Sequence, residues 1–190
     1  MAYCTAADVK LYLGVSGAGD DTLIGTLIDA AQAAIDTYTS RTFEAAADST
    51  RYFDAAGEHI TRGHLYVDGD LCQITTVTNG DSVVVASDEY TTMPRNVTPF
   101  FGLRLLSNSN IIWTYTDEYI NAITIVGRWA FSVTAPDDIA QACIRLASFY
   151  YRQKDAQLAD VTAIEAGVVV STPAMPAEVQ MTLAKYRRFS

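Results

Sequence analysis

The stretch that decides the fold is residues 20–38, DDTLIGTLIDAAQAAIDTY. Its apolar residues recur at spacings of three and four, the period of an α-helix. Asp20 and Asp21 place carboxylates where a helix N-terminus has unpaired backbone N–H groups. We predict a long amphipathic helix whose alanine-rich middle lets another helix approach closely. Its apolar residues are Leu23, Ile24, Leu27, Ile28, Ala31, Ile35 and Tyr38.

Shorter helical patterns lie on both sides of this stretch. Thr5 and Asp8 form a capping box, and Gly14 is a typical stop for the helix that follows it. Its expected apolar face is Val9, Tyr12 and Leu13. Near the other end of the chain, Pro136 and Pro176 each open a further predicted helix. The apolar positions of these two helices are Ile139, Ala142, Cys143, Leu146, Phe149 and Tyr150 in the first, and Val179, Leu183 and Tyr186 in the second.

Between about residue 43 and residue 132 the apolar period changes to two, which indicates β-strands. Asn79-Gly80 is a strong hairpin signal, because both residues tolerate positive φ. Residues 83–85 would form the return strand. The predicted strands are residues 71–78, 83–85, 90–93, 103–106, 111–115 and 122–129.

These patterns predict an α+β protein, a small antiparallel helical bundle with an inserted antiparallel β-domain. The bundle takes residues 1–43 and 133–190, and the β-domain takes residues 44–132. Residues 155–175 have no clear period, and a stretch of this length without one is often ordered only by a partner. We expect a flexible arm there, in which Val168, Val169 and Val170 add a strand to a neighbouring subunit.

The composition argues against several functional classes. The 190 residues carry a net charge of −9, which opposes tight DNA binding but suits a surface that DNA passes without sticking. The three cysteines are far apart, so we expect buried free thiols and neither a disulfide framework nor a zinc site. We expect no membrane span and no signal peptide, because long apolar runs and a basic N-terminal region are absent.

Catalytic motifs are also missing. The two histidines, His59 and His64, are five residues apart and do not belong to an HExxH motif. The chain has no GxSxG nucleophile elbow, and two histidines in one loop region leave few ways to build a Ser-His-Asp triad. We therefore expect no catalytic residues, no metal and no cofactor.

Several short segments occur along the chain in a characteristic order. They are Tyr3-Cys4-Thr5 with Asp8-Val9, residues 27–35, Arg41-Thr42-Phe43, residues 123–129, residues 137–143 with Leu146-Ala147, Tyr151-Arg152-Gln153 and Tyr186-Arg187-Arg188. Their order resembles the head–tail connector family of long-tailed bacteriophages, also called head-completion adaptors. The resemblance implies a structural virion protein assembled in the host cytoplasm and located in the neck. It implies a ring, usually of twelve subunits, that lies beneath the portal protein, extends the DNA channel and contacts a stopper or tail completion protein. It also implies that double-stranded DNA passes without specific binding.

Two groups of residues are candidates for specific roles. The basic C-terminal end is expected to dock onto an acidic patch of the portal, and an ordinary helix end with favourable cations is the alternative. A second group, with two arginines beside two aromatics, is expected to bridge the bundle and the β-domain. The first group is Lys185, Tyr186, Arg187, Arg188 and Phe189, and the second is Arg41, Phe43, Arg128 and Trp129.

Two other classes of function remain open from the sequence. A stopper or tail terminator shares the general features but should be mostly β-barrel, which two long helices disfavour. A small hydrolase or sugar-binding module would need a groove lined by tryptophan and tyrosine, and a sequence does not show a groove.

Overall fold

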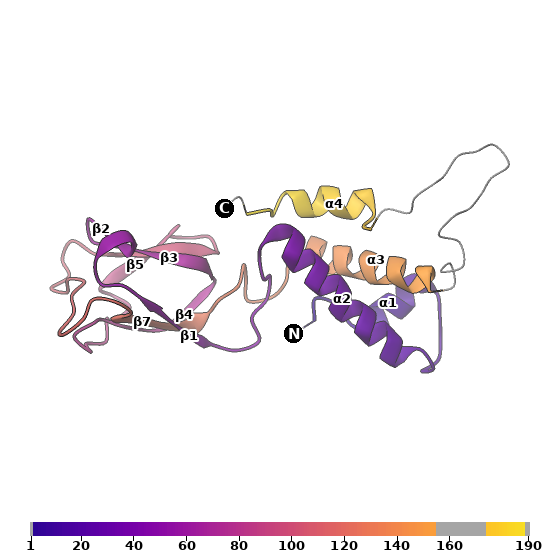
Figure 1. Cartoon of the computed structure of the whole chain (residues 1–190), viewed down its shortest axis with the longest axis horizontal. Helices are drawn as coiled ribbons and strands as arrows, with labels where there is room; N and C mark the ends of the chain where they lie inside the picture. Colours follow the sequence, from indigo (N-terminus) through magenta and orange to yellow (C-terminus); the bar gives the residue numbers. More distant parts are fainter. Residues whose placement is uncertain (1, 155–173, 189–190) are drawn as a thin grey trace. The chain divides into compact units, whose positions relative to one another are not determined.

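The computed structural model describes residues 2–154 and 174–188 (Figure 1). The chain divides into two compact units. We call residues 42–135 the β unit, and we call the segments on either side of it, residues 2–41 and the chain from Pro136 onward, the helical unit. The α+β class predicted from the sequence is confirmed by four helices and two antiparallel sheets.

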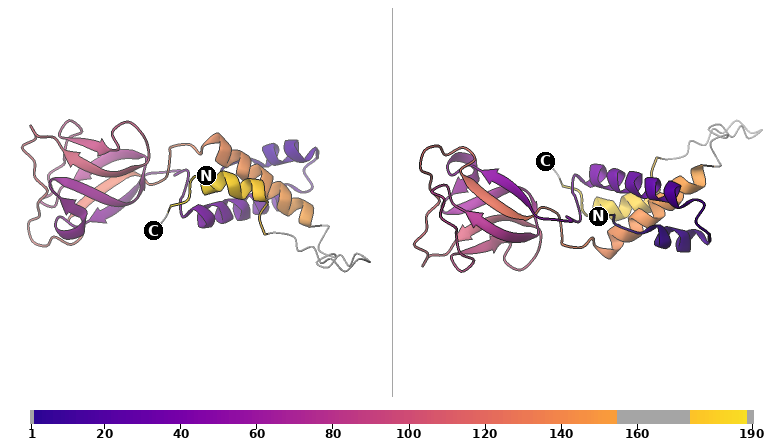
Figure 2. Two further views of the ribbon diagram at one scale, coloured as in Figure 1. Left: turned by 90° about the horizontal axis from the view of Figure 1, so that it is seen from above. Right: turned by 90° about the horizontal axis from the view of Figure 1, so that it is seen from below.

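The described residues of the helical unit form four α-helices, and α3 contacts each of the other three (Figure 2). Helices α1 and α2 come from the first segment of the unit, whereas α3 and α4 come from the second. Because the unit is made of two distant segments, its helices pack together only when both segments are present. The helices are α1 (Ala6–Leu13), α2 (Asp21–Thr39), α3 (Asp137–Gln153) and α4 (Ala177–Ala184).

The ends of α1 and the starts of α3 and α4 follow the local rules that the sequence suggested, whereas the Asp20 side chain makes no capping hydrogen bond at the start of α2. Thr5 and Asp8 form the predicted capping box, and Gly14 ends α1 at φ +71°. Pro136 and Pro176 each precede the first residue of a helix. The predicted apolar face of α1 is wrong in one respect, since Tyr12 is 48% exposed and only Val9 is fully buried.

The core of the helical unit lies along α3. Ile139, Cys143 and Leu146 have no exposed surface, and Ile24, Ile28 and Ile35 of α2 are buried as well. Each fully buried isoleucine or leucine side chain contributes about 1.5–3 kcal/mol to stability. None of the helices in the described residues is long and apolar enough to cross a membrane.

Two antiparallel sheets form the β unit, one with strand order β1-β7-β4 and the other with order β2-β3-β6-β5. One hydrophobic cluster takes side chains from both sheets, including Phe53, Leu65, Leu103 and Ile125, so the sheets share a core. The strands are β1 (Ser49–Phe53), β2 (Ile60–Thr61), β3 (His64–Leu71), β4 (Gln73–Thr78), β5 (Tyr90–Met93), β6 (Phe100–Leu105) and β7 (Ile123–Arg128).

Four of the six predicted strands are present. Residues 71–78, 103–106 and 122–129 match β4, β6 and β7 with small shifts at their ends, and residues 90–93 match β5. The prediction of a strand at 111–115 is wrong. That segment bonds instead to the buried side chain of Asn79, whose Nδ2 donates to the Ile112 carbonyl at 2.9 Å. Asn79 Oδ1 accepts from the Thr114 N–H at 3.2 Å. The Gly80 N–H also donates to the Thr114 carbonyl at 3.1 Å, so Asn79 and Gly80 hold this segment in place of a partner strand.

The hairpin after β4 forms, but not in the predicted way. The Asn79 N–H donates to the Val83 carbonyl, and Val85 donates back to Val77. Residues 83–85 make only one isolated bridge, between Thr78 and Val84, and the residue at positive φ is Ser82. Strands β1, β2 and β3 have no counterpart among the predicted strands.

Candidate interaction surfaces of the helical unit

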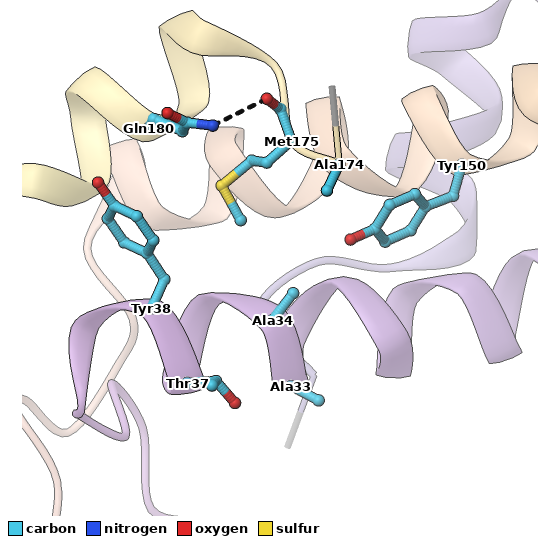
Figure 3. A pocket seen from close by; sticks show the side chains of 8 residues that line it. All are labelled: Ala33, Ala34, Thr37, Tyr38, Tyr150, Ala174, Met175 and Gln180. Atoms are coloured by element: carbon cyan, nitrogen blue, oxygen red, sulfur yellow. Dashed lines mark hydrogen bonds between the residues drawn. The ribbon is translucent and has the colours of Figure 1, made fainter. Parts of the chain in front are cut away.

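A groove opens between α2, the end of α3 and the start of α4 (Figure 3). Its volume is about 530 Å³. Tyr38 projects from α2 toward α4, Ala34 projects from α2 into the groove, and Tyr150 projects from α3. Small and apolar side chains dominate the lining, so the groove is shaped for packing. The lining residues are Ala33, Ala34, Thr37, Tyr38, Tyr150, Ala174, Met175 and Gln180.

Helix α4 is held in place by contacts at both of its ends. At its start, Gln180 Nε2 donates to the Met175 carbonyl at 3.0 Å, and Met175 is buried. Arg145 of α3 pairs with Glu178 at 2.7 Å. After its end, the Arg188 N–H donates to the Thr39 carbonyl of α2 at 2.9 Å. The wall of the groove that α4 forms is therefore anchored.

Among the described residues, tyrosine–aspartate hydrogen bonds join distant segments of the helical unit at three places. Tyr3 donates to Asp36 at 2.6 Å, and Tyr151 donates to Asp20. The Tyr186 hydroxyl lies 2.8 and 2.9 Å from the two carboxylate oxygens of Asp138. Each bond ties a terminal segment or a helix end to a neighbouring helix.

Burial and these bonds together shift the pKa values of the groups involved. Burial raises the pKa of Asp36. The hydrogen bond from Tyr151, together with that from Lys154, lowers the pKa of Asp20. Burial and the hydrogen bond to Asp138 raise the pKa of Tyr186 to about 12. The protonated form of Tyr186 is thus the form that the fold favours.

The C-terminal basic group divides into two parts. Lys185, Arg187 and Arg188 are exposed, whereas Tyr186 is half-buried and bonded to α3. The Arg187 guanidinium lies 5.9 Å from the centroid of the Tyr38 ring. The cations are therefore presented at the surface by a segment that Tyr186 fixes. Phe189 and the Val168–Val170 triplet lie outside the described residues, as do all residues of the expected arm except Ala174 and Met175.

The four expected bridge residues are placed as follows. Trp129 and Arg128 lie in the β unit, where Trp129 Nε1 donates to the Ser49 carbonyl at 3.0 Å and Arg128 lies 3.7 Å from Asp48. Phe43 is fully buried in the same unit, with its ring 5.6 Å from Phe131. Arg41 follows α2, and its N–H donates to the Asp36 carbonyl. Their bridging role stays a prediction.

Other kinds of site have little basis in the described residues. Those residues contain no group of three or more side chains that could hold a metal ion. His59 and His64 each bond through Nδ1 to a backbone carbonyl, of Tyr66 and Thr61 respectively. Sequence reasoning did not find the groove itself, because Met175 and Gln180 reach α2 only through the tertiary fold. The alanine run of α2 was the one local signal.

A comparison with protein-family models matches residues 2–189 to the family described as head completion protein. The chain belongs to the head completion protein family. No curated protein sequence matches this chain.

Solved structures from gene transfer agent (GTA) particles share the fold. A chain from the neck of an empty GTA particle, computed with C6 symmetry, has a TM-score of 0.58 and 17% identity. The match covers 97% of this chain and 89% of that one. A chain from the neck of the native particle, computed with C12 symmetry, gives a TM-score of 0.57, 16% identity and coverages of 97% and 88%. Both likenesses span the helical unit and the β unit.

Replacing Tyr186 with Phe should destabilise the helical unit of this head completion protein by about 1 kcal/mol at neutral pH, because a partly exposed bond to a carboxylate is lost. The raised pKa means that this contribution is present below the ordinary tyrosine pKa of about 10 and is lost as the pH rises toward about 12. Urea unfolding at neutral pH and at about pH 11 measures the difference between variant and parent.

The control for this comparison is Tyr12→Phe, which changes an exposed hydroxyl on α1 and should alter stability little. A Tyr186→Phe protein as stable as the parent at neutral pH would contradict the role given to this bond. So would a difference that is the same at both pH values.

Proposed function

We propose that this chain is a structural subunit of the neck of a tailed phage or phage-like particle, and that it acts there without catalysis. The observation that carries the proposal is the family match, which runs from residue 2 to residue 189 and so includes both units. The likeness to chains from GTA necks over 97% of the sequence supports it. The subunit would complete the head by forming a ring beneath the portal protein and above the stopper or tail completion protein.

A ring, of twelve subunits in this proposal, needs an interface that repeats by rotation, so two different surfaces of each subunit must meet. The groove on the helical unit is a suitable half of such an interface. Ala33 and Thr37 are exposed on the same side of α2, where small side chains allow the backbone of another element to approach. We assign the groove to a neighbouring copy of this chain.

The charge of the chain fits a channel that DNA crosses. The net charge is −9, and like charges repel the phosphate backbone, so passing DNA would slide without binding. The exposed C-terminal cations are an exception on this acidic protein. Lys185, Arg187 and Arg188 suit carboxylates on a protein partner, for which we propose the portal.

The neck assignment is tested by removing the gene from the phage and viewing the lysate by electron microscopy. Packaged or leaking heads separate from complete free tails are expected, because the joint between them would be missing. Supplying the chain from a plasmid should restore joined virions. Normal joined virions without the gene would contradict the proposal.

The groove is tested by Ala33→Arg, which places a long charged side chain at the proposed contact between copies. We expect the folded variant to lose incorporation into particles, by at least about tenfold, because an unpaired buried charge opposes association. The control is Ala7→Arg on α1, which is also an exposed helical alanine but does not line the groove. Complementation titres with unchanged circular dichroism provide the measurement. Equal titres for both variants would exclude the groove as an interface.

Reversing the charge of Lys185 and Arg187 together to Glu should abolish binding to purified portal, while Tyr186 stays to hold the segment. The matched control is Arg152→Glu, an exposed cation at the end of α3. Binding should also weaken with salt for the parent, because the contacts are ionic. A double variant that binds the portal as the parent does would contradict portal docking through these cations.

A further inference from the structure

The buried thiols of Cys4 and Cys143 lie against each other in the core of the helical unit. Their sulfur atoms are 3.3 Å apart, although 139 positions separate the residues in the sequence. Both residues are free cysteines, with Cys143 fully buried and Cys4 nearly so. A disulfide has an S–S length of about 2.0 Å, so a closing movement of about 1.3 Å would bond them.

The position of Cys4 is set by its neighbours on both sides. Tyr3 is bonded to Asp36 of α2, and Thr5 begins α1 with the capping box that it shares with Asp8. Cys143 lies in the middle of α3, the helix that contacts every other helix of the unit. The two thiols are therefore held in contact by structure that is present without the bond.

We propose that Cys4 and Cys143 form a disulfide when the protein meets an oxidant of the disulfide class, such as oxidised glutathione. This would lock the N-terminal segment onto α3. The inference rests on the fold of the helical unit and does not depend on the proposed neck role. A chain carried out of the reducing cytoplasm in a particle would meet conditions that favour the bond.

The reaction proceeds by two thiol–disulfide exchanges. The Cys4 thiolate attacks one sulfur of oxidised glutathione, which forms a mixed disulfide and releases one glutathione thiolate. The Cys143 thiolate then attacks the Cys4 sulfur and releases the second glutathione. Two electrons pass from the cysteines to glutathione, and the two protons leave with the released thiols. The two steps can equally begin at Cys143, because both thiols are accessible to glutathione while the chain refolds.

Cys72 provides an internal comparison. It is also buried, but its thiol lies 3.4 Å from the Arg128 carbonyl in the β unit, and no other cysteine belongs to that unit. If exposure or random encounter decided which thiols are oxidised, Cys72 would form linkages as readily as Cys4 and Cys143. Oxidation that follows the native geometry would leave it out.

The test is to unfold the full chain, refold it in buffers of varied oxidised-to-reduced glutathione ratio, trap the thiols and map the linkages by mass spectrometry. Refolding exposes all three thiols, so burial does not prevent the reaction. We expect a Cys4–Cys143 cross-linked peptide as the dominant linkage, with an intact mass lower by about 2 Da for the two hydrogens lost. The oxidised protein should melt on the order of 10 °C higher, because the bond closes a long loop.

The variants make the outcome decisive. Cys72→Ser should form the disulfide as the parent does, whereas Cys4→Ser should show only glutathione adducts and no rise in melting temperature. The proposal is overturned if linkages involving Cys72 are as abundant as the Cys4–Cys143 linkage. It is equally overturned if Cys4 and Cys143 remain reduced or carry only glutathione at every ratio.

Discussion

Helix α3 must bury its apolar side against three other helices that come from both ends of the chain. Ile139, Cys143 and Leu146 reach zero exposure only when α1 and α2 cover one part of α3 and α4 covers another. Between α2 and α3 the chain forms the whole β unit. The helical unit is therefore completed only after distant segments meet. Its folding depends on contacts between residues that lie far apart in the sequence.

The hydrogen bonds of the helical unit follow from this constraint. Packing brings the ends of the helices together, and tyrosine–aspartate bonds then fix those ends. The same packing leaves a groove beside α2, since Ala33 and Ala34 are too small to fill the space between α2 and the start of α4. An open groove beside α2 suits the proposed contact with a neighbouring copy of this chain. The family match is the reason for placing that proposed contact in head completion.

The elements that the sequence predicted well are those whose signals are local. The capping box of Thr5 and Asp8, the long period of α2 and the alternation of Ile123 and Ile125 in β7 each depend on neighbours a few residues away. The strand expected at 111–115 is absent because β-propensity does not say what the backbone bonds to, and here it bonds to the side-chain amide of Asn79 and the N–H of Gly80. Strand β3 carries charged residues such as Asp68 and Asp70 that hide its alternation, and Arg51 of β1 pairs with Asp68. The groove and the contact between Cys4 and Cys143 join distant segments of the chain, and one sequence does not reveal such distant pairs.

The long helices α2 and α3 also disfavour the alternative of a mostly β stopper or tail terminator.

The most direct test of the neck assignment is a cryo-electron microscopy map of the neck of the complete particle that contains this chain. The account predicts a closed ring between head and tail, with density that accommodates the helical unit and the β unit once per subunit and with the α2 groove covered by the adjacent copy. A neck whose density is filled entirely by other proteins, with this chain found elsewhere in the particle or not at all, would contradict it.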